Sequence, residues 1–238
     1  MTVTTQTVRE IALENPASIR VFEAFGIDYC CGGRKPLAEA CEARNISVDS
    51  VITALEKGAG YPAPTEDWSE RSLGLLAAHI VNTHHAYVRK ELPRLAELAA
   101  KVVNRHGDTK PELPEIQKKV AQISEELSEH LAKEEVVLFP YVTRLERAKE
   151  EGTAKPHGCF ATVASPIAMM TQEHEAAGAL MADIRELSGD YTPPVGACPT
   201  FHAFYSGLRE FEQDLHQHIH LENNILFPRA LEMEKAAK

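Results

Sequence analysis

Apolar residues recur at helical spacing along most of the chain, and no segment alternates apolar and polar residues as a half-buried strand would. Four long segments of this kind occupy Ser69–Asn104, Pro111–Lys149, Pro166–Leu187 and Cys198–Lys238. Breaks rich in glycine, proline and small polar residues separate them. Because the connections are fairly short, the pattern predicts an antiparallel four-helix bundle.

The first 57 or so residues predict shorter helices, at Asn15–Gly26, Pro36–Asn45 and Ser47–Lys57. In the first of these, Asn15 is expected to cap the helix, with Pro16 at its first position and Gly26 at its end. A segment this short buries little core by itself. We therefore expect a small helical module rather than a large domain.

A stretch rich in glycine and proline, Gly58–Thr65, lies between these two parts and predicts a linker. The fold class is thus all-α, a small helical N-terminal domain followed by the bundle. The expected divisions are residues 1–60, a linker at 61–68 and a bundle at 69–238.

Composition adds limits on the class of protein. With 44% hydrophobic and 25% charged residues, the chain has the balance of an ordinary globular protein. No run approaches the roughly 18 to 20 apolar residues of a membrane span, and the polar start lacks the apolar core of a signal peptide. Five cysteines, an odd number, then favour reduced thiols in the cytoplasm. The net charge of −10 argues against a nucleic-acid partner.

A motif of ligand-type residues occurs twice in the predicted bundle. One copy reads HLAKEEVVLFP from His130, and the other reads HIHLENNILFP from His218. Each copy is His-x3-Glu followed by Leu-Phe-Pro, and each has an upstream histidine at nearly the same distance. His85 precedes His130 by 45 residues, and His174 precedes His218 by 44. Such a repeat is typical of a symmetric metal site between helical hairpins.

The four histidines lie on four different predicted helices. Positions i and i+4 share one face of a helix, so Glu134 points the same way as His130, and Glu222 the same way as His218. Each imidazole can bind one metal ion while each carboxylate reaches between two. This donor set suits iron, manganese or zinc, and paired bridging carboxylates favour iron in oxygen or nitric oxide chemistry. The candidate ligands are His85, His130, Glu134, His174, His218 and Glu222.

The other histidines fit such a site less well. Five lie off this face, far along a helix or in a loop: His79, His157, His202, His216 and His220. His106 reaches the site only if its helix ends early and the chain folds back. His84 adjoins His85 and remains an alternative, although His85 matches the repeat spacing better. A lone histidine on an apolar face is more often a hydrogen-bonded core residue, so the duplication carries the inference.

Cys30 and Cys31 are neighbours in the segment DYCCGG that begins at Asp28. A disulfide between adjacent cysteines is strained and easily reduced, so we expect free thiols suited to redox or soft-metal chemistry. Arg34, Lys35 and the next helix N-terminus are expected to lower the thiol pKa values. The alternative is a pair of packed thiols without chemistry. The remaining cysteines are expected to be structural, or in one case have no assigned role: Cys41, Cys198 and Cys159.

Together, these motifs resemble a known family. The DYCCGG segment, Leu92-Pro93 and the two His-x3-Glu-x3-Leu-Phe-Pro segments are similar to those of the repair-of-iron-centres (RIC) proteins of the YtfE/ScdA type, and the second domain resembles a hemerythrin-like bundle. The resemblance covers essentially the whole chain. The connection 151–165 is not recognised as a family feature.

The resemblance implies a centre of two non-haem iron ions, with oxo and carboxylate bridges, held by the six candidate ligands. It implies repair of iron-sulfur clusters damaged by nitric oxide or oxidants, with Cys30 and Cys31 relaying iron or nitrosyl groups. The implied partners are damaged iron-sulfur proteins and small ligands such as nitric oxide or oxygen; a homodimer is compatible with this role. Two other functions stay open, an oxygen or nitric oxide sensor or carrier, and an enzyme that reduces nitric oxide.

Overall fold

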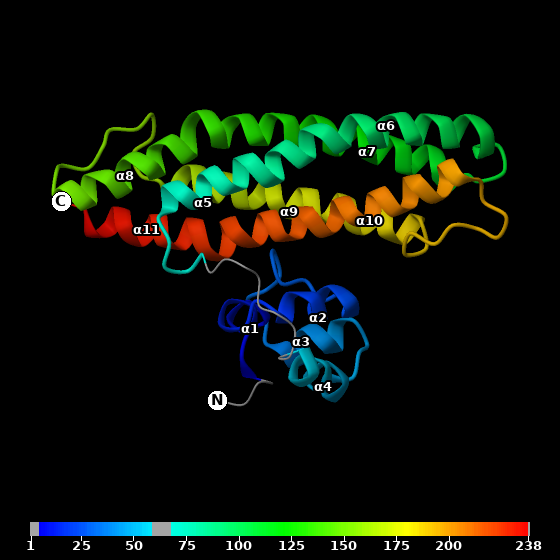
Figure 1. Ribbon diagram of the computed structural model, residues 1–238, viewed down its shortest axis with the longest axis horizontal. Helices are drawn as coiled ribbons and strands as arrows, with labels where there is room; N and C mark the ends of the chain where they lie inside the picture. The colour runs from blue at the N-terminus through cyan, green and yellow to red at the C-terminus, as the bar shows by residue number, and fades with distance from the viewer. Residues whose placement is uncertain (1–4, 59–67, 238) are drawn as a thin grey trace.

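The computed structural model describes residues 5–58 and 68–237 (Figure 1). Within these ranges it is helical and holds no β-strand, and an isolated bridge pairs Thr7 with Pro36. The predicted all-α class is confirmed. Of the predicted linker at 61–68, all but Trp68 lies outside the described residues.

Each of the four long predicted segments forms one rod of an antiparallel bundle (Figure 1). The first comprises α5 (Leu73–Ile80), η2 (Val81–His85) and α6 (Ala86–His106). The second comprises α7 (Glu112–Lys133), η3 (Glu134–Leu138) and α8 (Phe139–Glu151). The third is α9 (Ala164–Leu187). The fourth comprises α10 (Pro199–His220), η4 (Leu221–Leu226) and α11 (Phe227–Ala236). Helix α6 packs on α7 and α10, and α7 packs on α9.

Local sequence sets the ends of these rods. The Ser72 hydroxyl accepts the N–H of Leu75 at the start of α5, and the Glu146 carboxylate accepts the neighbouring N–H groups of Leu73 and Gly74. On the second rod, Gly152 takes the left-handed conformation with φ 63° and ends α8. The hydrogen bonds to Glu146, which belongs to α8, hold the start of α5 against α8 and align the first two rods.

The apolar core of the bundle is divided into two clusters. One contains buried residues of α5, α8, α11 and the start of α9, such as Leu76 and Phe227. The other contains buried residues of α6, α7, the rest of α9 and α10, such as Leu95 and Phe204. The histidines and glutamates of the repeated motif lie in the polar layer between them. A buried polar layer costs stability unless its groups are paired, so this division marks a functional region.

The first domain consists of α1 (Val8–Glu14), α2 (Ser18–Phe25), α3 (Leu37–Ala43) and α4 (Val48–Gly58). Its buried residues belong to the same apolar cluster as α6, α7 and α10, so the domain packs against the bundle (Figure 1). The sequence analysis missed α1, although its N-terminus carries a capping box between Thr7 and Glu10.

The predicted start of α2 was wrong by two residues. Asn15 does not cap the helix: its side-chain oxygen accepts the N–H of Ala17 in a turn, and α2 begins at Ser18. The local Asn–backbone bond competes with helix formation, which delays the start. The predicted end was right, because Gly26 adopts φ 63° there.

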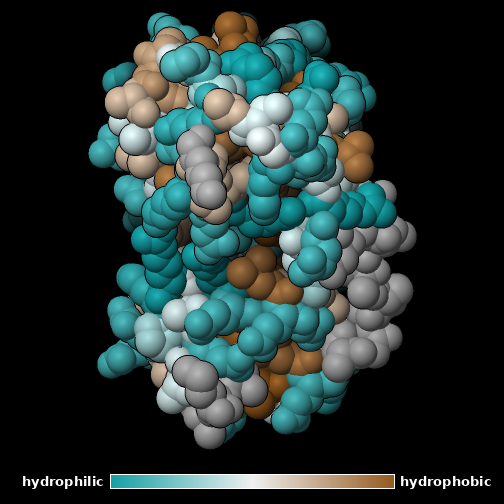
Figure 2. Space-filling model, turned by 90° about the vertical axis from the view of Figure 1, so that its left-hand side faces the viewer, coloured by the Kyte–Doolittle hydropathy of each residue, from teal (hydrophilic) through white to brown (hydrophobic). Residues whose placement is uncertain are grey.

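The long connection before α9 lies against the ends of two helices. The Lys155 ammonium is 2.9 Å from Glu234 Oε1, and the ring of Phe160 packs edge-on against Tyr141. Cys159 is exposed on this connection. Hydrophilic side chains cover most of the face in Figure 2, with hydrophobic side chains in separate patches. None of the helices in the described part is long and apolar enough to cross a bilayer.

Candidate metal centre

The structure brings all six predicted ligands into one buried layer of the bundle. They form two groups that share both carboxylates, and within each group the ligand atoms lie within 4.8 Å of one another. One group contains His85 and His218, and the other contains His130 and His174. We call these the His85/His218 pair and the His130/His174 pair.

The two imidazoles of each pair meet through their Nε2 atoms. The Nε2–Nε2 distance is 3.2 Å in the His85/His218 pair and 3.1 Å in the His130/His174 pair. In the second pair both Nδ1 atoms donate to oxygen, His130 to Glu173 and His174 to Asn223. With an N–H on each Nδ1, the Nε2 atoms that face each other are the nitrogens that could bind a cation.

The two carboxylates lie between the pairs. Glu134 Oε2 is 3.4 Å from His85 Nε2 and 3.3 Å from His130 Nε2, so it faces one ring of each pair. Glu222 divides its oxygens, with Oε1 3.1 Å from His218 Nε2 and Oε2 3.0 Å from His174 Nε2. Each carboxylate therefore lies where it could reach two cations, one beside each histidine pair.

Three of the rods contain a π-helical segment at this layer, among the residues that the structure describes. In two of them the Phe of Leu-Phe-Pro bonds back five residues to a candidate ligand: Phe139 N–H donates to the Glu134 carbonyl, and Phe227 N–H to the Glu222 carbonyl. The following proline has no N–H with which to continue an α-helical ladder. π-Helical turns of this kind frequently occur at functional sites.

The charges of the layer fit two cations. Both oxygens of Glu134 are buried without a hydrogen-bond donor among the described residues. Burial, and then the nearby Glu222 carboxylate, raise the pKa of Glu134 well above its ordinary value. Burial opposes ionisation of Glu222 as well, but His218 and His174 hold its pKa well below the ordinary value. Two imidazoles with two shared carboxylates are donors that suit iron, manganese or zinc, so the residues fit a two-metal centre.

Burial also keeps the histidines ready to bind a metal. It lowers the pKa of His85 and of His130 to about 4, with His218 and His174 respectively as the next cause. Both rings are therefore neutral near pH 7. A neutral imidazole presents a lone pair to a metal ion, whereas a protonated one does not.

Carboxylates and an amide outside the layer hold three of the four rings. His85 Nδ1 donates to Glu135, 2.7 Å away, and the Arg89 guanidinium pairs with the same carboxylate. His130 Nδ1 donates to Glu173 at 2.8 Å, and Lys133 pairs with that carboxylate. His174 Nδ1 donates to Asn223 Oδ1 at 3.0 Å. Such partners fix the tautomer and the orientation of a ligand ring.

The sequence analysis missed these outer residues, although a signal was present. Glu135 follows Glu134, Glu173 precedes His174, and Asn223 follows Glu222. Each adjoins one candidate ligand in the chain but binds a histidine of a different rod. The sequence shows the adjacency, whereas the pairing depends on how the rods pack.

His218 has different surroundings. Its Nδ1 is buried without a partner among the described residues, and the ring of His84 stacks on it at 5.6 Å between centroids. His84 Nδ1 in turn donates to Asp214 Oδ1 at 3.0 Å. His84 is thus outside the two ligand groups and covers one face of the His218 ring.

The remaining histidines lie away from the layer. His106 ends a continuous α6 and lies 3.4 Å from the Cys198 sulfur. His216 and His220 face the first domain and contact the ring of Tyr29. His157 and His202 are exposed.

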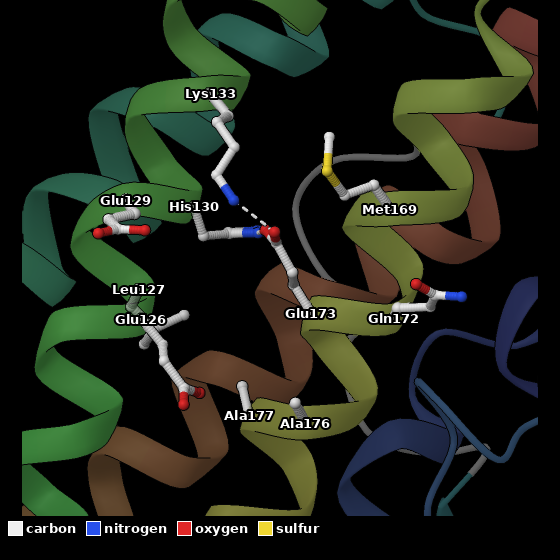
Figure 3. A pocket seen from close by; sticks show the side chains of 10 residues that line it. All are labelled: Glu126, Leu127, Glu129, His130, Lys133, Met169, Gln172, Glu173, Ala176 and Ala177. Atoms are coloured by element: carbon white, nitrogen blue, oxygen red, sulfur yellow. Dashed lines mark hydrogen bonds and ion pairs between the residues drawn. The ribbon is translucent and has the colours of Figure 1, made fainter.

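A pocket of about 280 Å³ reaches His130 from between α7 and α9 (Figure 3). Its lining is acidic and includes Glu126, Glu129 and Glu173. Figure 3 shows the Lys133 side chain directed at Glu173 across the pocket, with Met169 beside it. The pocket therefore reaches the outer side of the His130 ring, where Glu173 lies over Nδ1.

The cysteine pair, which belongs to the first domain, lies beside the His130/His174 pair. Cys31 Sγ is 3.7 Å from the His174 carbonyl oxygen, and a Cβ added at Gly178, one turn later, would lie 3.7 Å from that sulfur. The two cysteine sulfurs are 3.8 Å apart and unbonded. The thiols and the pocket thus approach the His130/His174 pair from different sides of α9.

The expectation of low thiol pKa values was wrong for Cys30. The hydrogen bond with Cys31, burial and the Asp28 carboxylate raise the pKa of Cys30 well above its ordinary value. Arg34 and Lys35 are exposed and do not offset this. Asp28, which the sequence analysis quoted without a role, accepts the N–H groups of Cys30, Cys31 and Gly32 and thereby shapes the turn.

Comparison with known proteins agrees with this geometry. Residues 76–230 match the Hemerythrin HHE cation binding domain family, and residues 4–59 match ScdA_N, a domain of unknown function (DUF542). "Iron-sulfur cluster repair protein YtfE" of Pectobacterium atrosepticum is 38% identical over 230 residues, which cover 96% of this chain and 98% of the relative. The proteins of that name from Pectobacterium carotovorum and Yersinia pseudotuberculosis are 38% and 36% identical over the same shares.

The chain belongs to the YtfE family of iron-sulfur cluster repair proteins. The resemblance first seen in the DYCCGG and His-x3-Glu motifs is confirmed. The hemerythrin-like match spans the candidate ligands, and this match together with the buried His/Glu cluster indicates iron binding.

Proposed function

We propose that this protein holds two iron ions in the buried layer and uses iron to repair damaged iron-sulfur clusters, the activity that the relatives' names state for them. The observation that carries the proposal is the pair of His/Glu groups sharing Glu134 and Glu222. His85 and His218 would hold one ion, and His130 and His174 the other. Bound there, iron supplies a redox-active centre that can take up oxygen or nitric oxide.

The chain's own residues protect and position this centre. The two apolar clusters on either side exclude water from the layer, and the outer carboxylates Glu135 and Glu173 hold the histidine rings. On the His130/His174 side, the acidic pocket gives a cation a route between the layer and solvent. Iron that leaves for a damaged cluster is then the substrate of the repair reaction.

We further propose that Cys30 and Cys31 relay iron or a nitrosyl group between the His130/His174 pair and a damaged iron-sulfur protein in the cytoplasm, under nitrosative or oxidative stress. Their position beside the His174 carbonyl supports this role. Because the pKa of Cys30 is raised, its thiol keeps its proton until a metal ion displaces it. The Cys30 thiol is thus protonated at rest.

The test is repair of an iron-sulfur enzyme inactivated by nitric oxide, followed by recovery of that enzyme's activity. The wild type is expected to restore activity, and Glu134→Ala to lose the effect together with the iron. Cys30→Ala plus Cys31→Ala is expected to keep the iron but lose most of the repair, while Cys159→Ala, an exposed cysteine, serves as the matched control. Full repair by the double cysteine variant would contradict the relay.

The same protein samples decide between this function and its two alternatives. Reversible uptake of oxygen or nitric oxide over many cycles, with no repair and no effect of the cysteine variants, would indicate a sensor or carrier. Sustained formation of nitrous oxide with an electron donor, lost in Glu222→Ala, would indicate an enzyme that reduces nitric oxide.

A further inference from the structure

The π-turn η4 touches the metal layer and the first domain at once. Glu222 faces both histidine pairs, and the next residue, Asn223, accepts the Nδ1–H of His174. Asn224 is turned the other way, and its side-chain Nδ2 donates to the Tyr29 carbonyl of the first domain at 3.0 Å. Three consecutive residues thus link the layer to the residue that precedes the cysteine pair.

The backbone of the same turn makes a second link. Pro228 has no N–H, so the Asn224 carbonyl lacks its normal α-helical donor. Arg9 of α1 fills this place, because its Nη2 donates to the Asn224 carbonyl at 3.0 Å. A buried carbonyl without a donor is unfavourable, so the proline makes this position a specific acceptor for the first domain. We call the two links together the Arg9–Asn224–Tyr29 bridge.

The bridge determines where the thiols lie. Tyr29 directly precedes Cys30, and Asp28 fixes the turn that follows through the N–H groups of Cys30 and Cys31. With the Tyr29 carbonyl held on Asn224, the Cys31 sulfur lies against the His174 carbonyl and Gly178. The thiol position is therefore set by contacts with the π-turn as well as by the first domain itself.

We propose that Arg9 and Asn224 are positioning residues that dock the cysteine pair at the His130/His174 pair, and that this docking is coupled to metal binding through η4. The proposal rests on the proposed function in taking the layer as the metal site. Ligation by Glu222 and His174 orders the turn that carries Asn223 and Asn224. Whatever orders that turn also favours the bridge, and by linkage the bridge favours metal retention to the same degree.

The experiment measures how fast each cysteine is alkylated, resolved by mass mapping of the peptides, in metal-free protein and after anaerobic addition of Fe(II) alone. In the wild type, Fe(II) is expected to slow labelling of Cys30 and Cys31 by about fivefold. Arg9→Ala plus Asn224→Leu is expected to label them about tenfold faster than the wild type and to lose the dependence on Fe(II).

Matched variants separate docking from general damage. Arg20→Ala removes an exposed arginine of the same domain and is expected to label as the wild type does. Arg9→Lys keeps a cationic donor and is expected to restore part of the protection. Arg9→Ala alone, which leaves the bundle sequence intact, is read in place of the double variant if Asn224→Leu lowers the helix content. A chelator is expected to withdraw iron faster from the Arg9 variant than from the wild type. The ratio of the two rates should equal the ratio by which cysteine labelling is faster in the variant.

Two results would overturn the proposal. One is wild-type labelling of Cys30 and Cys31 in the double variant. The other is a double variant whose labelling still slows as much on addition of Fe(II) as that of the wild type. Neither readout measures repair, so failure of the cysteine relay can be distinguished from failure of the docking proposal. If the double cysteine variant repairs normally while labelling behaves as expected, the relay is wrong and the bridge stands.

Discussion

The two histidine pairs contain the same kinds of atoms but meet different surroundings. Their Nε2–Nε2 distances are nearly equal, and they share Glu134 and Glu222. The His85/His218 pair is covered by His84, which stacks on His218 and donates to Asp214. The His130/His174 pair borders an acidic pocket on one side and Cys31 on the other. The two pairs thus offer the same donor atoms, whereas the residues around them differ.

The substitution with the largest expected effect disrupts metal binding at both histidine pairs. Glu222→Ala deletes a carboxylate that faces His174 and His218, so we expect nearly all iron to be lost from the purified protein. Cys30→Ala plus Cys31→Ala should keep full iron, because the thiols lie outside the layer. Glu125→Ala, an exposed glutamate of α7, is the control. Metal analysis decides the point, and equal iron in the Glu222 and cysteine variants would contradict the ligand assignment.

The two pairs should respond together to pH. The raised pKa of Glu134 means that the metal-free protein carries a proton there, and a bridging carboxylate must lose it. Metal affinity should therefore fall as pH decreases from neutral, by up to about tenfold per pH unit for one coupled proton. His85 and His130, with pKa values of about 4, add to this fall only near that pH.

Calorimetry in buffers of different ionisation enthalpy measures this coupling directly. We expect release of about one proton at pH 7 as metal binds. Metal binding without proton release at that pH would mean that Glu134 is already ionised in the metal-free protein.

Two further variants should show that the two histidine pairs differ in how fast they release iron. Glu173→Gln removes the carboxylate that holds His130 beside the pocket, and Glu135→Gln removes its counterpart at His85. Loss of such an outer partner typically weakens metal binding by 10- to 100-fold. We expect a ferrous chelator to withdraw the first iron about tenfold faster from the Glu173 variant, with a smaller change in the Glu135 variant. Equal acceleration in both variants would mean that access to the two pairs is the same.

The substitutions with the smallest expected effects test two histidines that lie outside the candidate metal layer. His220 hydrogen-bonds with the Asn224 side chain at 2.9 Å and contacts Tyr29, so His220→Ala should keep full iron but lower the free energy of unfolding by about 1–2 kcal/mol. His202 is exposed, and His202→Ala should change stability by less than about 0.5 kcal/mol. Denaturant unfolding together with metal analysis measures both. Loss of iron in either variant would place a ligand where the structure does not.

The sequence predicted what depends on spacing along the chain. Matching distances from His85 to His130 and from His174 to His218 selected four histidines, and the i, i+4 rule added Glu134 and Glu222; the structure brings these six residues together. The four rods and the left-handed Gly26 followed from periodicity and helix-end signals. These features depend on local geometry, which the residues carry with them.

What the sequence did not predict depends on packing between distant segments. Glu135, Glu173 and Asn223 bind histidines of other rods, so their roles appear only once the rods are in contact. The raised pKa of Cys30 follows from the hydrogen bond with Cys31, from burial and from Asp28, which outweigh the nearby but exposed basic residues. The π-turns were missed because the helical pattern was read with one period throughout, although the repeated Leu-Phe-Pro marks where it changes.

The most direct test is anomalous X-ray diffraction at the iron absorption edge from crystals of the iron-loaded wild type. The two-metal account predicts two peaks per chain in the buried layer, one beside the His85/His218 pair and one beside the His130/His174 pair. A single peak in the layer would contradict the two-metal account, and peaks only outside the layer would leave the six residues as a hydrogen-bonded core.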